Sequence, residues 1–380
     1  MDIPWLAEYY KTADIIVGEA RHFLETSNTK FDLIYYAFLD PKAILSENIV
    51  PDVSFLYTRQ GIKTAYSRLS ENGWLIIRRV YIKAFEEEFI ERHCSTLTAA
   101  GIKRDQILFL KSEKTYSQGA LELCWAVIVV AKNSESIYRL KNEDTARGTL
   151  IEATWKVKEE SIITDSHPFS FIPKLKFSSL LDIDLLRPYV LVFIIFLLIA
   201  SGFFILSSLS SVNFFLLGYA YMLFESIVIY HSFLLIGNPS LSAGIAIGVF
   251  LISNSFGSMY SENFKKKKKL LFILPAVVFI FGFFFIDSIS FIVKFSPLIR
   301  LLWFSLILFP LGFLIGTLFP IFLRCFIEKS VSYLYFIDLI GCAVAPLTFS
   351  FMMVMYGLTA PVMVSFMCYF IVIFILNMRD

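Results

Sequence analysis

The sequence predicts an α/β domain with a mostly parallel sheet, followed by a polytopic bundle of about seven membrane helices. Of the 66 Asp, Glu, Lys and Arg residues, only 18 follow Asp182 in the 380-residue chain. Hydrophobic residues make up 57% of the chain, more than soluble domains usually contain. Short apolar runs alternate with helical stretches in the first half. We therefore expect a water-soluble domain over 1–180 and a membrane domain over 181–380.

The predicted strands and helices of the soluble half alternate along the chain. Apolar runs predict strands at 15–17, 33–38, 74–77, 107–110 and 121–130, with helices over 56–69 and 85–99. Strands that are separated by helices favour parallel pairing, with the helices packed on the faces of the sheet. Asn72-Gly73 predicts a turn that leads into the strand at 74–77.

Seven stretches after Asp182 are long and apolar enough to cross a bilayer. They are 189–206, 213–236, 241–259, 270–286, 298–322, 335–356 and 359–378. Gly244 and Gly248 are four residues apart, as are Gly312 and Gly316. This spacing places each pair on one helix face, so we expect a neighbouring backbone to approach closely at both pairs.

Three ionisable residues lie inside predicted spans, namely Glu225, His231 and Asp338. Such groups are costly in a membrane unless they are satisfied, so they predict a polar membrane site. That site either conducts protons or binds a substrate, or else it ties helices together by hydrogen bonds. Glu225 and His231 are about 120° apart around a helix, so a direct relay between them is not expected. Arg300, near a span end, is expected to be an interfacial anchor.

The charges near the span ends give conflicting orientations for the soluble domain. The lysine run at 265–269, Arg324 with Lys329, and Arg379 should all be cytoplasmic. Counting back through three complete spans then places the soluble domain outside the cytoplasm. We expect instead that the span carrying Glu225 crosses incompletely, which leaves the domain cytoplasmic on an inner (cytoplasmic) membrane. The net charge of +2 predicts no nucleic-acid partner, and the five scattered cysteines predict no metal site.

Several short motifs occur in the order seen in one known family. They are Gly-Glu-Ala-Arg at 18–21, Phe-Asp-Leu-Ile at 31–34, Asp-Pro at 40–41, Leu-Tyr-Thr at 56–58, Asn-Gly-Trp-Leu at 72–75, Thr-Asp-Ser-His-Pro-Phe at 164–169 and the segment 214–239 around Glu225. Together they resemble the bacterial polytopic, membrane-embedded spermidine-synthase-like proteins of the S-adenosylmethionine-dependent transferase superfamily. The resemblance implies that the chain corresponds to their C-terminal portion, with an incomplete Rossmann-like sheet before the membrane bundle.

The departures from this family decide the expected chemistry. The Gly-rich turn after the first strand and the acid that ends the second are not found, so we expect the chain to begin partway through the domain. Ala37 stands where aminopropyl-transferring members carry a proton-accepting aspartate. No catalytic residue is therefore expected, although Asp40 is a weak candidate. Glu19 and Asp40 are expected to be remnants of the cofactor site.

Three functions follow from this comparison. The first is a non-catalytic docking or regulatory module carried on a helical bundle in the lipid bilayer, with no cofactor bound by this chain alone. The second is an aminopropyl or methyl transferase that uses S-adenosylmethionine or its decarboxylated form, completed by an upstream-encoded polypeptide that supplies the missing strands. The third is transport of a small solute through the bundle.

Overall fold

The computed structural model describes most of both halves of the chain. The described residues are 14, 16, 20–37, 55–118, 121–142, 150–168, 209–236, 239–265, 271–293, 295–325 and 330–378. The predicted strand at 15–17, the predicted span at 189–206, and the residues Glu19 and Asp40 lie outside this set, apart from Ile16.

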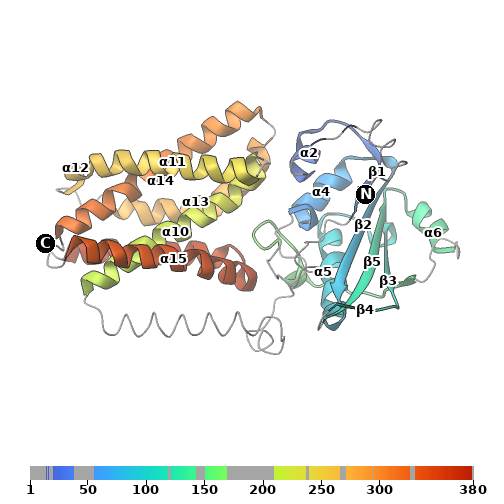
Figure 1. Cartoon of the computed structure of the whole chain (residues 1–380). Coiled ribbons are helices and arrows are strands. Elements are labelled where there is room, and N and C mark those ends of the chain that lie inside the picture. Colours follow the sequence, from blue (N-terminus) through green and yellow to red (C-terminus); the bar gives the residue numbers. More distant parts are fainter. Residues whose placement is uncertain are drawn as a thin grey trace, which may run out of the picture.

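A six-stranded sheet forms the N-terminal domain (Figure 1), and five of its strands follow the order β1-β2-β5-β3-β6. The short strand β4 pairs with β5. The strands are β1 (Phe31–Tyr36), β2 (Leu69–Ile82), β3 (Ile107–Ser112), β4 (Tyr116–Gln118), β5 (Leu121–Ala131) and β6 (Leu150–Glu152). Four of the five predicted strands thus fall on β1, β2, β3 and β5.

The sheet is mixed, which corrects the expectation of a mostly parallel one. β1 and β2 pair in parallel, but β5 lies antiparallel between β2 and β3. Because β5 opposes both of its neighbours, β1, β2 and β3 all run in the same direction. The connection from β3 to β5 is short and contains only β4, and such a short connection can join only antiparallel strands.

Helices cover both faces of the sheet. α2 (Ala20–Thr26), α4 (Arg59–Ser67) and α5 (Glu86–Ala99) share a core with the strands on one face, whereas α6 (Ser134–Asn142) packs on the other through Ile137. The predicted turn at Asn72-Gly73 is wrong, because both residues lie within β2. A side chain at Gly73 would come within 2.8 Å of the Phe31 carbonyl oxygen, beside a register shift in β1. The glycine therefore lets β1 approach this irregular part of β2.

Long helices build the second half of the chain. They are α10 (Leu209–Ile236), α11 (Pro239–Met259), α13 (Ile273–Ile292), α14 (Pro297–Cys325), α15 (Val331–Tyr356) and α16 (Thr359–Met378), with the short α12 (Ser261–Lys265) between α11 and α13. Among the described residues, five of these helices are long and apolar enough to cross a membrane, and α13 carries a shorter apolar stretch at Ile273–Gly282. This part of the chain is therefore compatible with a multi-pass membrane protein.

Helix α10 lies at the centre of the bundle. Of its apolar stretch 67% is buried, against 28–44% for the other four candidate spans. Its Gly218 packs against the backbone of α15, where an added Cβ would lie 2.1 Å from the Asp338 carbonyl oxygen. Gly341 of α15 packs in turn against α10, where an added Cβ would lie 2.2 Å from the Phe215 carbonyl oxygen. Glycine is required at such positions because backbone atoms occupy the space of a side chain.

The two glycine pairs behave differently. Side chains at both glycines of α14 would clash with α11. A Cβ at Gly312 would lie 2.0 Å from the Ser253 Oγ, and a Cβ at Gly316 would lie 2.3 Å from the Asn254 carbonyl oxygen. The predicted close approach of a backbone is confirmed at Gly316, whereas Gly312 meets the side chain of Ser253. At Gly244 and Gly248 nothing among the described residues lies within 4 Å, so the described part of the bundle makes no such approach at α11's own pair.

This contrast predicts opposite effects of one substitution. Gly316→Ala should lower the free energy of unfolding by about 1–3 kcal/mol, because α11 and α14 must move apart. Gly244→Ala should leave it unchanged or raise it by up to about 1 kcal/mol, since alanine has the higher helix propensity. Thermal unfolding of both variants in detergent, followed by circular dichroism, measures the difference. Equal losses would show that α14 does not pack on α11 through Gly316.

Candidate functional site

A buried carboxylate lies where the α/β domain meets the bundle. Asp165 accepts hydrogen bonds from Arg21 Nη1 at 2.7 Å and from Thr58 Oγ1 at 2.6 Å. Arg21 also donates through Nε to Glu25 at 2.8 Å. Thr58 is the N-cap of α4, where its hydroxyl accepts from the backbone of Gly61. Burial alone would lower the pKa of Arg21, but the carboxylates of Asp165 and Glu25 outweigh it and raise that pKa.

The residues after Asp165 contact the bundle directly. The Ser166 carbonyl oxygen accepts a hydrogen bond from the backbone N–H of Leu358, in the connection between α15 and α16. Gly357 before it has a φ of 70°, and a Cβ there would lie 2.7 Å from the Ser166 oxygen. Glycine is favoured here because it adopts a positive φ without strain and because it has no Cβ to meet the Ser166 oxygen. We call Arg21, Thr58, Asp165, Ser166 and Leu358 the Asp165 junction.

A second contact joins the two parts beside this junction. Arg300 Nη1 lies 2.8 Å from His22 Nε2 and donates to the Leu235 carbonyl oxygen, also at 2.8 Å. Burial and the neighbouring guanidinium lower the pKa of His22 to about 4, so its imidazole is neutral at pH 7 and can accept from Arg300. Arg300 is buried at this contact, which corrects its prediction as an interfacial anchor.

His231 belongs to the junction end of α10 and not to a site shared with Glu225. Its ring is buried, with Nδ1 2.6 Å from the Ile227 carbonyl oxygen, and it lies within electrostatic range of Asp165. The neighbouring Tyr230 ring packs edge-on against Phe55 of the domain, with centroids 5.4 Å apart. The sequence identified His231 as a buried polar group, but only the fold reveals its partner region.

Glu225 and Asp338 lie near a second region, a cavity of about 320 Å³ between α10, α11, α14 and α15. Asp338 of α15 and Tyr221 of α10 line this cavity. The Tyr221 hydroxyl interacts with the carboxyl group of Glu225, which is buried, and with the Asn254 side chain. The bundle thus places Asp338 in the lining of this cavity and Glu225 behind Tyr221, which also lines it.

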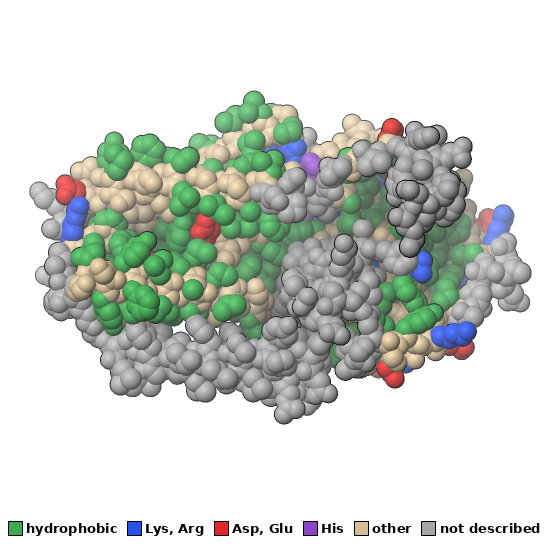
Figure 2. All heavy atoms as spheres, viewed as in Figure 1, with side chains coloured by type: hydrophobic (Ala, Val, Ile, Leu, Met, Phe, Trp, Pro, Cys, Tyr) green, Lys and Arg blue, Asp and Glu red, His purple; other side chains and the backbone are tan. Residues whose placement is uncertain are grey.

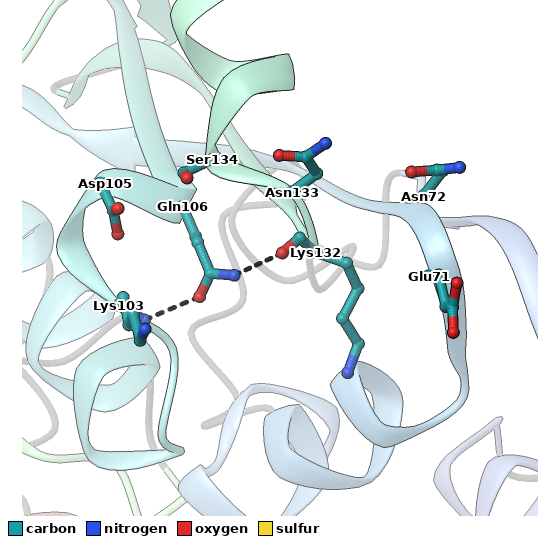
Figure 3. A pocket seen from close by; sticks show the side chains of 8 residues that line it. All are labelled: Glu71, Asn72, Lys103, Asp105, Gln106, Lys132, Asn133 and Ser134. Atoms are coloured by element: carbon teal, nitrogen blue, oxygen red, sulfur yellow. Dashed lines mark hydrogen bonds between the residues drawn. The ribbon is translucent and has the colours of Figure 1, made fainter.

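The domain also has a surface pocket of about 430 Å³ (Figure 3). It lies at the amino ends of β2 and β3, where Gln106 accepts from the Lys103 backbone N–H at 3.1 Å and donates to the Lys132 carbonyl oxygen at 2.5 Å. The other lining residues are Glu71, Asn72, Asp105, Asn133 and Ser134. Ligands of open α/β sheets bind at the carboxyl ends of the strands. This pocket is therefore at the wrong edge for such a cofactor.

Ala37 directly follows β1, at the carboxyl edge of the sheet, and is exposed. Its methyl group can neither accept a proton nor bind a cation. Glu19 and Asp40, the predicted cofactor remnants, lie outside the described residues. Within the described parts of the chain, no group of three or more His, Cys, Asp or Glu side chains is arranged to hold a metal ion.

Comparison of the chain with protein-family profiles, with curated proteins and with solved structures found no match. Sequence reasoning did not predict that Arg21, Thr58 and Asp165 meet. A signal for it was present, because each of the three belongs to a different motif among those at 18–21, 56–58 and 164–169.

Removing the buried carboxylate tests the Asp165 junction. Asp165→Asn should lower the free energy of unfolding by about 2–4 kcal/mol, because it leaves Arg21 with one of its two anionic partners. The matched control is Glu135→Gln, which breaks an exposed pair with Arg139 at 2.7 Å and should cost less than about 1 kcal/mol. Chemical denaturation in detergent gives both values. Similar losses for the two variants would contradict a structural role for the junction.

Proposed function

We propose that this chain is a multi-pass membrane protein whose α/β domain is a non-catalytic docking or regulatory module on the helical bundle. The domain resembles, in its motifs, the Rossmann-like domain of the polytopic spermidine-synthase-like proteins. The observation that carries the proposal is the Asp165 junction, where buried side chains and a backbone hydrogen bond to Leu358 tie the domain to the bundle. A partner that binds the domain can act on the helices only through such a coupling.

The carboxyl edge of the sheet supports a non-catalytic role. The resemblance requires a carboxylate at position 37 to accept a proton, and Ala37 does not fit that chemistry. The polar pocket that the domain does have lies at the opposite edge of the sheet. The alternative is a transferase completed by a second polypeptide that supplies the cofactor-binding turn, and it would need a proton acceptor from that partner as well.

Titration with S-adenosylmethionine distinguishes the module from the enzyme. Calorimetry on the purified chain should show no binding below millimolar concentration if the domain is a docking module. The decarboxylated form should behave in the same way, because both depend on the same edge of the sheet. A clear heat at micromolar concentration would overturn the proposal and restore a transferase.

Three basic segments indicate on which side of the membrane the domain lies. They are the lysine run at 265–269, Arg324 with Lys329, and Arg379. Arg324 at the end of α14 pairs with Glu262 of α12 at 3.3 Å, and the lysine run at 265–269 begins at the last residue of α12. Figure 1 shows α12 and the C-terminus, with Arg379 next to last in the sequence, at the bundle end farthest from the domain. The described ends of α12, α14 and α16, which the three basic segments follow or overlap in the sequence, thus lie at the bundle end opposite the Asp165 junction.

Helix α10 does not favour the incomplete crossing that would reconcile a cytoplasmic domain with these charges. It is one uninterrupted helix of 28 residues, about 42 Å long, which exceeds a hydrocarbon core of about 30 Å. The positive-inside rule then favours a cytoplasmic location for the basic end of the bundle. We infer that the α/β domain faces away from the cytoplasm, in place of the cytoplasmic location expected from its resemblance to cofactor-binding domains.

Labelling from one side of the membrane tests this orientation. A cysteine introduced at Glu135, which is exposed on α6, should react with an impermeant maleimide added to intact cells. A cysteine at Ser330, exposed at the start of α15, should react only after the cells are permeabilised. The parent chain, with its five native cysteines, provides the background. The reverse pattern would place the domain in the cytoplasm.

The cavity in the bundle favours a second candidate function, the transport of a small solute. Tyr221 links the cavity to the buried Glu225, so polar groups continue from the cavity into the bundle core. Buried ionisable residues in spans commonly mark substrate or proton pathways. A docking module that regulates a transporter would combine both functions in one chain.

A further inference from the structure

We propose that the cavity between α10, α11, α14 and α15 is a binding site for a small organic cation, namely a protonated amine. The inference deepens the transport candidate and does not depend on the docking role of the domain. The cavity measures about 320 Å³, at the lower end of the range for small-molecule sites. Its residues are Leu217, Gly218, Tyr221, Leu251, Asn254, Ser255, Ser258, Ile315, Gly316, Phe319, Pro320, Tyr335 and Asp338.

The charge of the lining selects a cation. Asp338 is the one acidic lining residue, and no Lys, Arg or His is found among the lining residues that the structure describes. Figure 2 shows acidic atoms beside hydrophobic side chains on this face of the bundle. A carboxylate in this setting is costly unless a positive group satisfies it. An anionic ligand would instead add a like charge and is excluded.

The fold holds this carboxylate at the cavity through a glycine. A Cβ at Gly218 would lie 2.9 Å from Asp338 Oδ1 and 2.1 Å from the Asp338 carbonyl oxygen. Only glycine leaves room for the backbone and the carboxyl group of Asp338 at this point of α10. The contact therefore fixes the position of Asp338 without any side chain that would neutralise it.

A second acceptor belongs to Asn254, another residue of the lining. The Oδ1 atom of Asn254 is buried and has no hydrogen-bond partner among the described residues. The Asn254 side chain interacts with Tyr221, which leaves the amide oxygen available. A buried acceptor without a donor costs about 1–3 kcal/mol. An ammonium group carries up to three N–H donors, enough for Asn254 and Asp338 together.

The aromatic and apolar part of the lining favours an organic cation over a metal ion. The rings of Phe319 and Tyr335 meet edge-on with centroids 6.0 Å apart, and both line the cavity. Aromatic faces attract alkylammonium groups. A hard metal ion usually takes several charged oxygen ligands within about 2.6 Å, whereas this lining supplies one carboxylate and no described group of three or more His, Cys, Asp or Glu side chains could hold a metal. The alkyl part of an amine has apolar surface to contact here.

The direct test uses the full chain in phosphatidylcholine nanodiscs, titrated with n-butylammonium chloride. Binding should be saturable, whereas n-butanol and sodium chloride at equal concentrations should give no comparable heat. Asp338→Asn should weaken n-butylammonium binding at least tenfold. The matched control is Glu262→Gln, which neutralises an acid at the far end of the bundle and should leave the affinity unchanged.

A second variant covers the case in which Asp338→Asn fails to fold. Asn254→Ala removes the free amide oxygen while keeping the carboxylate, and it should weaken binding about three- to tenfold. Equal binding of n-butanol would overturn the proposal, because the site would then recognise the alkyl chain alone. Equal binding of sodium would overturn the organic class of ligand. Unchanged affinity in both variants would exclude this cavity as the site.

Uptake into proteoliposomes separates the site from the transport candidate. Saturable binding without uptake of n-butylammonium would support the amine-binding site and contradict the transport function. Uptake of a neutral solute without n-butylammonium binding would contradict the amine-binding site and support the transport function. If both hold, Glu225→Gln should abolish uptake while retaining measurable binding, because Glu225 lies behind Tyr221 and outside the cavity lining.

Discussion

The buried ion pair between Arg21 and Asp165 is the interaction on which the connection of the two halves depends. A buried pair stabilises a protein only when both charges find further hydrogen-bond partners. Here Glu25 supplies the second partner for the guanidinium and Thr58 the second for the carboxylate. The pair therefore holds α2, the start of α4 and the turn around Ser166 in one arrangement, and that turn contacts Leu358 of the bundle.

Much of the fold could be predicted because its signals are local. The run that became β3 is continuously apolar and the run that became β5 is apolar except for Glu122, and the helix pattern of α5 ends where the structure ends it. The direction of β5 had a signal that the prediction did not use: only ten residues separate the predicted strands at 107–110 and 121–130, too few for a parallel crossover. The turn predicted at Asn72-Gly73 failed for a different reason. Its glycine serves close pairing with β1, a tertiary requirement that overrides turn propensity.

The site was predictable in its residue types but not in its groupings. Hydropathy alone marks Glu225, His231 and Asp338, because an ionisable residue in an apolar span is conspicuous. It cannot tell that His231 belongs to the domain junction while Asp338 lines a cavity with Tyr221. The glycine pairs show the same limit. Identical spacing at Gly244 and Gly312 gives packing at one and open space at the other, because the sequence does not specify which face meets a neighbour.

The two regions are connected mechanically by α10. Its residues Tyr230 and His231 lie at the junction, and Tyr221 lies at the cavity about 14 Å further along the same helix, at 1.5 Å per residue. On one side of the cavity α10 meets α15 backbone to backbone at Gly218, and on another α14 meets α11 at Gly316. Packed helices of this kind move as rigid elements with few alternative arrangements. A shift of α10 driven from the domain would therefore carry Tyr221, together with Asp338 packed at Gly218, relative to α11 and α14 and change the cavity.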